Sequence, residues 1–201
     1  MIETYGSAPF IAEGLGFHYT LLSDNLCIFS RFPIRQTFLF PDSISPFHFG
    51  GAEVFIQEKI SVVFFDTWLH YLPDARDVPL NETSEKIIAW EKEGTRDDEI
   101  EVILNTIEPF LKNSNNIPVI MGGDFNSHSH LDWTEETKDI YHHGGAVVDW
   151  PVSKSICAAG LIDSYREIFP YPAVNIGVTW LSGNNINGKS QYSRQDRIDY
   201  L

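Results

Sequence analysis

The sequence predicts an α/β fold in a single domain that spans residues 1–201. Hydrophobic residues make up 43% of the chain and aromatic residues 13%, a composition far from that of a disordered chain. A chain of 201 residues is also long enough to bury one sizeable core. Short apolar segments typical of strands alternate with amphipathic segments typical of helices. This alternation favours a sandwich of strands and helices.

Strands are expected in the first third of the chain at Leu26 to Ser30, Ala52 to Gln57 and Ile60 to Leu69. Glu58 and Lys59 would form a tight connection between the last two. The segment from Leu72 to Gly94 that follows is polar and irregular, with one helical turn around Ser84 to Trp90. Long irregular segments often carry function, so this one is a candidate for a loop that shapes a substrate site.

The clearest helix is predicted over Asp97 to Lys112. Apolar residues recur there at intervals of three and four positions, and Thr95 to Asp98 resembles a capping box. A second helix is expected from Ser153 to Ala159, where Gly160 would end it. The segment from Ser182 to Ser193 is rich in Gly, Asn and Ser and is predicted to be a mobile loop.

The most informative segment, residues 118–126, reads as a buried strand that ends in an acid and an amide. Two glycines, Gly122 and Gly123, permit backbone angles or close approaches that are closed to other residues. Because Phe125 separates Asp124 from Asn126, a continued extended backbone would point both polar side chains to one side. An acid that activates water and an amide that holds a charged oxygen would then face the same space. A polar turn is the alternative interpretation.

The charge of the chain bears on its substrate. The formal net charge is -14, with 14 Lys and Arg against 28 acidic residues and no basic cluster. Proteins that bind long nucleic acids usually present a basic patch to the phosphates. Nucleic acid therefore stays possible as a partner but is not favoured, and a small or lipid-like phosphoester is preferred.

Other features restrict the class of protein less strongly. No stretch approaches the roughly 18 consecutive apolar residues of a membrane span, and no secretory signal is visible at the N-terminus. Cys27 and Cys157 read as small buried apolar residues more readily than as a disulfide or a metal pair. Compartment and oligomeric state stay open.

Five segments match, in order, the motifs of one known family. They are Ile2-Glu3, Ile28 to Ile34, Phe64 to Leu72, Gly123 to Asn126, and Thr179-Trp180 followed by Asp196 to Tyr200. In this order they resemble the endonuclease/exonuclease/phosphatase family, the superfamily of DNase I-like metal-dependent phosphoesterases. One departure is that Trp68 and Leu69 stand between Thr67 and His70, where the family pattern has no residues.

The resemblance implies a DNase I-like four-layer sandwich of two mixed β-sheets flanked by helices, incomplete at both chain ends. The family has a strand bearing an asparagine ahead of its glutamate and a Ser-Asp-His block beyond its last motif. Neither is found in the 201 residues, since Glu3 stands almost at the start and Leu201 is the last residue. We therefore expect this fragment alone to be impaired in activity.

The resemblance also implies hydrolysis of a phosphodiester or phosphomonoester by an activated water, with Mg²⁺ or possibly Mn²⁺ as the cation. Glu3 would bind the metal, and Asp124 would orient or deprotonate the attacking water. Asn126 would position the acid or the phosphate, and His70 would donate to a phosphoryl oxygen. Asp199 matches the acid that orients a final catalytic histidine, which this chain does not contain.

Weaker candidates for substrate binding are Arg31, His130, Trp133 and Trp180. Arginines at strand ends and helix starts more often pair with nearby acids, and tryptophans more often fill cores. Pairing with nearby acids is also the alternative for Arg96 and Arg197. For His70 the alternative is a half-buried histidine that is bonded to a neighbouring carbonyl.

Three further interpretations stay open. A zinc site built from His128, His130 and Asp132 is conceivable on spacing. A true endonuclease or exonuclease acting on DNA or RNA is the rival activity, and a noncatalytic domain that binds phosphorylated ligands or partners is the rival class.

Overall fold

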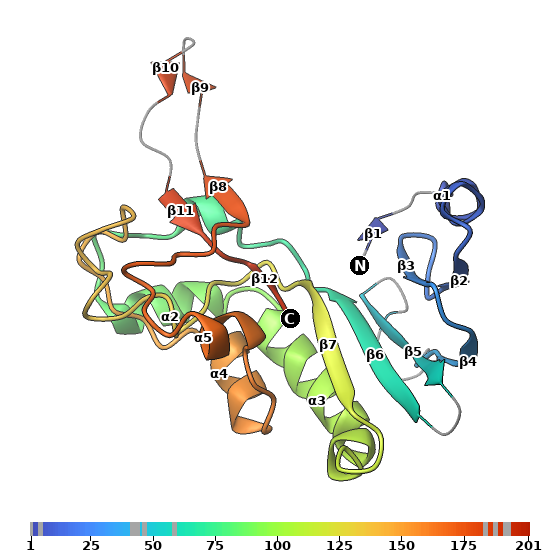
Figure 1. Cartoon of the computed structure of the whole chain (residues 1–201). Helices are drawn as coiled ribbons and strands as arrows, with labels where there is room; N and C mark the ends of the chain where they lie inside the picture. The colour runs from blue at the N-terminus through green and yellow to red at the C-terminus, as the bar shows by residue number, and fades with distance from the viewer. Residues whose placement is uncertain are drawn as a thin grey trace. The chain divides into compact units, whose positions relative to one another are not determined.

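The computed structural model describes residues 2–3, 6–40, 45, 48–57, 60–182, 185–186, 189–190 and 194–201, and leaves out the side chains of 2–3, 182, 185–186, 189–190 and 194. The predicted α/β class is confirmed, since the described residues form several sheets and helices (Figure 1). The chain divides into two compact units. Unit 1 comprises Met1–Leu69, Val102–Gly123 and Leu201, and unit 2 comprises His70–Glu101 and Asp124–Tyr200.

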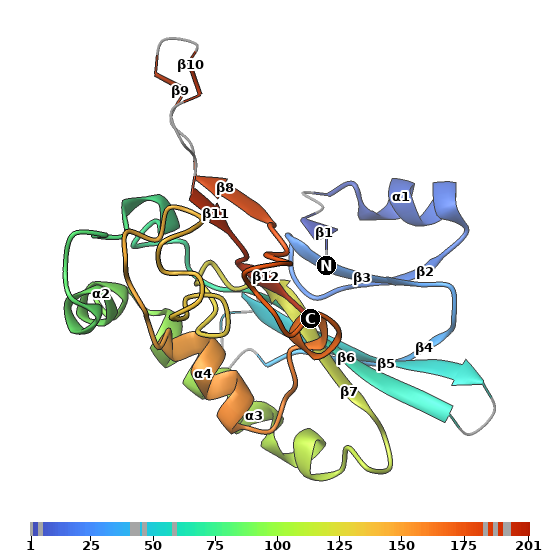
Figure 2. The ribbon, with the colours of Figure 1, turned by 60° about the vertical axis from the view of Figure 1, so that its left-hand side comes forward.

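Unit 1 begins with a small antiparallel sheet in the order β1-β3-β2. Its strands are β1 (Ile2–Glu3), β2 (His18–Leu21) and β3 (Leu26–Ser30), and β3 matches the predicted strand. Helix α1 (Ala8–Leu15) lies along this sheet and contacts β2 (Figure 2). The sheet therefore holds β1, the strand with Glu3, directly against β3.

A second sheet of unit 1 contains β4 (Ile34–Phe38), β5 (Phe49–Gln57), β6 (Ile60–Trp68) and β7 (Val119–Asp124), which neighbour one another in that order. β5 pairs antiparallel with both β4 and β6. The predicted strand at residues 60–69 is confirmed except for its last residue, and the one at 52–57 starts three residues earlier, at Phe49. The predicted Glu58–Lys59 connection lies outside the described residues.

Aromatic side chains fill the core of unit 1. The Phe65 ring lies 5.3 Å from the Phe49 ring in a stacked pair and 5.2 Å from the Phe110 ring in an edge-on pair. Phe110 comes from α3 (Arg96–Lys112), the helix predicted from its periodicity, which begins one residue before the predicted start. Rings at these separations and angles make favourable aromatic contacts, so they help to hold α3 against the second sheet.

Gly123 shows why the strand at 119–124 requires a glycine near its end. A Cβ atom built on Gly123 would lie 2.0 Å from the carbonyl oxygen of Thr67 in the neighbouring strand β6. No side chain fits at that distance, so the close approach of the two strands depends on glycine. The expectation of a close backbone contact at this pair of glycines is confirmed.

Unit 2 is built from short elements and long connections. They are the 3₁₀ turn η1 (Ala75–Asp77), the helices α2 (Ser84–Glu91), α4 (Pro151–Ala158) and α5 (Ser164–Ile168), and the strands β8 (Trp180–Ser182), β9 (Asn185–Ile186), β10 (Lys189–Ser190), β11 (Arg194–Asp196) and β12 (Asp199–Tyr200). The helical turn predicted around 84–90 is confirmed as α2. Helix α4 starts two residues before the predicted position because Pro151 suits the first turn of a helix.

Residues 182–193, predicted as a loop, contain the two-residue strands β9 and β10, which pair antiparallel. The parts of this segment at 183–184, 187–188 and 191–193 lie outside the described residues. Within unit 2, β8 pairs antiparallel with β11. The core of this unit is a cluster of buried apolar residues, namely Val78, Ile87, Trp133, Ala146, Val148 and Trp150. Across the described residues, no helix has the length and apolar character needed to cross a membrane.

Candidate functional site

Residues 123–126, called the GDFN segment, form a tight polar turn at the end of β7. Asp124 Oδ1 accepts a hydrogen bond of 2.9 Å from the backbone N–H of Asn126, and Asn126 has a left-handed backbone with φ of 49°. The extended backbone therefore does not continue through Asn126, and the argument that alternation alone aims both polar side chains to one side is wrong. The alternative interpretation, a polar turn, describes this backbone better, because Asn tolerates that conformation.

This turn is tied to residues 197–200, called the RIDY segment. Phe125 is buried, and its N–H donates to the carbonyl oxygen of Ile198 at 2.9 Å. Thr179 connects to the same segment, since its hydroxyl accepts from the N–H of Ile198 at 3.0 Å and from that of Asp199 at 3.2 Å. The fourth and fifth of the sequence blocks that carry the family resemblance thus meet in unit 2, where both parts of the fifth block also contact each other. Sequence reasoning named Thr179 as part of a block but missed this role.

Asp199 lies half-buried beside Thr179. Burial raises the pKa of the Asp199 carboxyl, and a hydrogen bond with Thr179 opposes part of that shift. A carboxyl with a raised pKa holds its proton more readily than an exposed aspartate does. The role that the resemblance implies for Asp199 stays a prediction.

His70 follows β6 and lies half-buried in unit 2. Its backbone N–H donates to Glu99 Oε2 at 2.9 Å, and its ring Nδ1 lies 3.3 Å from both the carbonyl oxygen and the amide nitrogen of Leu72. The Tyr71 ring lies 5.2 Å away at a tilt. The ring is thus held through Nδ1 by the local backbone, which agrees with the alternative interpretation of a histidine bonded to a neighbouring carbonyl. It also fixes the ring orientation.

A buried charged pair links His70 to the GDFN turn. Arg96 and Glu91 are at most 1% exposed, and the Arg96 guanidinium donates through Nε and Nη2 to both Glu91 oxygens. Arg96 Nη1 also donates to the carbonyl oxygens of His70 at 3.3 Å and Pro73 at 2.8 Å. The Ser127 hydroxyl, one residue after Asn126, donates to Glu91 Oε1 at 2.7 Å.

The RIDY segment closes the same network from its other end. The Tyr200 hydroxyl donates to the carbonyl oxygen of Ser127 and lies 3.1 Å from that of Arg197. The chain of contacts from His70 through Arg96, Glu91 and Ser127 to Tyr200 is called the 91/96 network below. Sequence reasoning missed Glu91 and Ser127, whose contact joins residues far apart in the chain. Arg96 is a structural residue and is not available to a phosphate.

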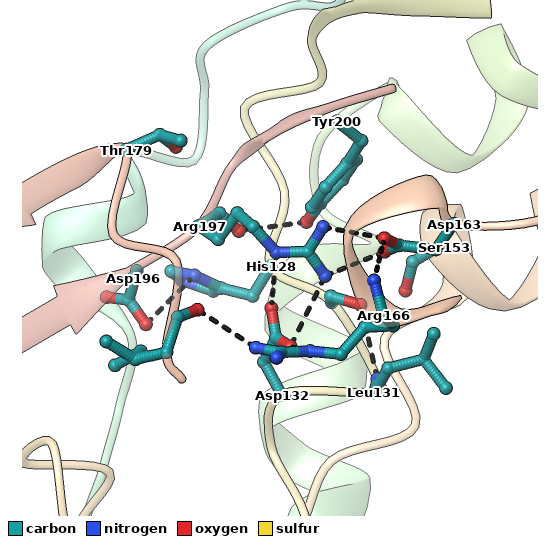
Figure 3. A network of polar contacts seen from close by, with 12 residues as sticks. His128, Leu131, Asp132, Ser153, Asp163, Arg166, Thr179, Asp196, Arg197 and Tyr200 are labelled. Atoms are coloured by element: carbon teal, nitrogen blue, oxygen red, sulfur yellow. Dashed lines mark hydrogen bonds and ion pairs between the residues drawn. The ribbon is translucent and has the colours of Figure 1, made fainter. Parts of the chain in front are cut away.

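Arg197 is likewise committed to acids, as Figure 3 shows. Its guanidinium donates to Asp132 Oδ2 at 3.0 Å and to Asp163 Oδ2 at 2.7 Å, and Arg166 Nε donates to Asp132 Oδ1 at 2.6 Å. All of these charged groups are buried or nearly so. The interpretation that Arg197 pairs with nearby acids is confirmed, and a direct phosphate contact from it is excluded in this structure.

The conceivable zinc set of His128, His130 and Asp132 does not form. Asp132 binds the two arginines described above, His130 Nδ1 lies 2.9 Å from Ser153 Oγ, and His128 Nδ1 lies 3.4 Å from Asp196 Oδ1 (Figure 3). Their closeness in sequence therefore does not place them around one point. Within the described part of the chain, no group of three His, Cys, Asp or Glu side chains could hold a metal ion.

The weaker substrate-binding candidates occupy different environments. Trp133 is 1% exposed and its indole N–H donates to Asp196 Oδ1 at 3.2 Å, so it is a core residue in this structure, not a surface platform. Trp180 is 37% exposed on β8. Arg31, in unit 1, is exposed with its guanidinium 5.5 Å from the centre of the Phe17 ring.

His130 lines a hollow of about 460 Å³ in unit 2. The other lining residues are Leu131, Thr134, Glu135, Glu136, Arg166, Pro170 and Pro172. Burial lowers the pKa of His130, which favours the neutral imidazole. A substrate group held beside His130 stays a prediction, and the hollow is large enough for a small ligand.

Glu3 is placed by its backbone alone. It pairs with Leu26 in the β1–β3 ladder of unit 1, and its side chain lies outside the description. Metal binding by Glu3 therefore stays a prediction.

Comparison with known proteins adds a relative but no activity. No family model matches the sequence. An uncharacterized protein of Caenorhabditis elegans is 34% identical over 159 residues, which amount to 75% of this chain and 50% of the worm protein. The chain thus spans about half the length of the curated relative that it matches.

Proposed function

We propose that this protein is a metal-dependent phosphoesterase that hydrolyses a phosphodiester or a phosphomonoester with an activated water. We further propose that its α/β architecture is a DNase I-like sandwich. The observation that carries the proposal is the 91/96 network in unit 2. It ties together His70, the GDFN turn and the RIDY segment, three blocks that are distant in sequence and that the resemblance assigns to one site.

In this proposal, Asp124 orients or deprotonates the attacking water. Asp124 and Asn126 are both half-buried residues. Asn126 would donate through its amide to a phosphoryl oxygen or position the acid. His70, oriented through its Nδ1, would donate to a phosphoryl oxygen as negative charge develops there.

A divalent cation would neutralise charge on the phosphoryl oxygens and lower the pKa of a bound water. Glu3 would contribute a carboxylate oxygen, the ligand type that Mg²⁺ and Mn²⁺ prefer.

The charge of the chain supports a small or lipid-like ester over a long nucleic acid. With a formal net charge of -14, the chain would repel a polyanion wherever a bound cation does not compensate. A nuclease remains the rival activity within the same chemistry, and experiment separates a small phosphoester from a nucleic acid as the substrate.

The test uses the full-length protein and bis(p-nitrophenyl) phosphate. We expect turnover that depends on added Mg²⁺ or Mn²⁺, and Asp124→Asn and His70→Ala should each lower kcat by roughly 100-fold or more, because proton transfer typically contributes that much. Exposed residues of the same types provide matched controls, and Asp98→Asn and His18→Ala should keep full turnover.

Melting temperatures decide whether a lost activity reflects lost chemistry. If either active-site variant unfolds, its residue is structural, and equal turnover in excess EDTA would contradict the proposal. Plasmid nicking that weakens steeply with added salt would identify a nuclease instead.

A further inference from the structure

Asp66 is a buried acid in unit 1 whose side chain has no hydrogen-bond partner among the described residues. It lies on β6, is 3% exposed, and neither carboxylate oxygen has a hydrogen-bond partner among the described residues. Burying an ionised carboxylate without a partner is strongly unfavourable, so such a group is normally protonated, paired or bound to a cation. Asp66 therefore indicates a missing positive charge or a proton.

Asn25 is a second buried side chain in the same state. It directly precedes β3 and is 1% exposed, and neither its amide nitrogen nor its amide oxygen has a partner among the described residues. An amide oxygen left without a donor is rare in protein interiors. Two unsatisfied buried side chains in one unit are more informative than either alone.

The backbone brings Asn25 and Asp66 to one region. Asp66 pairs with Gly50 across β5 and β6, and a Cβ built on Gly50 would lie 2.9 Å from Leu22 Cβ. The N–H of Leu22 in turn donates to the Leu26 carbonyl oxygen at 2.9 Å, which closes the turn that contains Asn25. This turn therefore packs on β5 beside the position that Asp66 occupies.

Contacts between β3, the strand that follows Asn25, and β6, the strand that carries Asp66, agree with this proximity. The donors that the two side chains offer are the carboxylate of Asp66 and the amide oxygen of Asn25, which are the ligands of hard cations such as Mg²⁺ and Mn²⁺.

Asn25 also lies next to the strand that carries Glu3. Leu26, the residue after Asn25, is the partner of Glu3 in the β1–β3 ladder, and Cys27 is the partner of Ile2. The turn with Asn25 therefore stands at the end of this ladder, one position beyond Glu3.

We propose that Asp66 and Asn25 supply oxygen ligands to a hard divalent cation in unit 1. The inference rests on the proposed function only where it identifies this ion with the cation of the hydrolytic reaction. Binding itself follows from the two buried side chains. The ion would compensate the Asp66 charge and accept the lone pairs of the Asn25 oxygen.

The test measures cation binding independently of turnover. The full-length protein is titrated with Mn²⁺ by calorimetry, and its melting temperature is followed with EDTA and with Mg²⁺ or Mn²⁺. We expect the wild type to melt at a higher temperature with the cation, and Asp66→Asn to bind Mn²⁺ at least roughly tenfold more weakly, since even supporting contacts to metal ligands contribute that much. Asn25→Ala should weaken binding in the same direction.

Asp24→Asn is the matched control, because it removes one carboxylate from the same turn at an exposed position. It should leave Mn²⁺ affinity unchanged. The inference is overturned if the wild type shows no cation-dependent stabilisation, if Asp66→Asn keeps it, or if Asp24→Asn loses it equally. If Asp66→Asn melts at a higher temperature than the wild type, and by the same amount with and without cation, Asp66 holds a proton instead of a cation.

The two proposals fail separately. Cation binding that needs Asp66 in a protein that hydrolyses no phosphoester would remove the proposed function alone. Metal-dependent hydrolysis with unchanged Mn²⁺ affinity in Asp66→Asn would remove the Asp66 and Asn25 ligands alone.

Discussion

The two units bury acids in opposite ways. In unit 2, Glu91 is 1% exposed, and its carboxylate accepts from Arg96 and from Ser127. In unit 1, Asp66 is 3% exposed and has no hydrogen-bond partner in the described part of the chain. A paired carboxylate holds neighbouring segments in place, whereas an unpaired one requires something that the polypeptide does not itself supply. The first is a structural support and the second is a candidate binding position.

Replacing Glu91 tests this difference between the two units most directly. Replacing one partner of a buried pair leaves the other charge uncompensated, so Glu91→Gln should lower the free energy of unfolding by roughly 3–5 kcal/mol. Arg96 would then lie buried among the carbonyl oxygens of His70 and Pro73 with no carboxylate. Urea denaturation measures the difference.

The neighbouring exposed acid provides the control for this change. Glu93 is exposed two residues further along the chain, so Glu93→Gln should leave the unfolding free energy nearly unchanged. If the two variants unfold at the same urea concentration, Glu91 does not support the site as described.

Asp66 should respond in the opposite direction, and the response should depend on pH. Burial raises the pKa of Asp66 from 3.8 to about 7. A raised carboxyl pKa means that the folded state binds the proton more tightly, so this acid destabilises the fold increasingly as pH rises from about 4 to about 7. Without divalent cation, Asp66→Asn should therefore raise the melting temperature near neutral pH and above. The corresponding gain in the free energy of unfolding is roughly a few kcal/mol.

Below about pH 4 the variant and the wild type should converge, because both side chains are then neutral. The measurement is a series of melting curves in EDTA across this pH range, with Asp24→Asn as the exposed control. A pH-independent difference between Asp66→Asn and the wild type would mean that the carboxyl does not titrate in this window.

The sequence predicts the regular parts of both units better than their polar contacts. The helix at 97–112 follows from local periodicity, and the strands at 26–30 and 60–69 follow from short apolar runs rich in residues that favour strands. The role of Gly123 was also accessible, since a glycine before a polar strand end indicates a close backbone contact. These features depend on residues that are near in sequence.

The candidate site is only partly accessible in that way. The order of the motifs predicted that the GDFN and RIDY segments belong together, and the backbone bond from Phe125 to Ile198 agrees with it. The left-handed Asn126 was not predicted, because an extended strand and a turn are both compatible with Asp-Phe-Asn. Ser127 and Glu91 were missed because their contact joins residues 36 positions apart, and no local pattern reports it.

The smallest effect is expected for a charged pair at the surface, which completes the comparison of buried and exposed acids. Lys86 Nζ lies 2.6 Å from Glu82 Oε2, with both side chains largely exposed. Water screens such a pair, so Lys86→Ala should change the free energy of unfolding by no more than about 0.5 kcal/mol, and less at high salt. Urea denaturation at low and high salt tests this. A loss approaching that of Glu91→Gln would show that exposure does not separate supporting from incidental ion pairs in this protein.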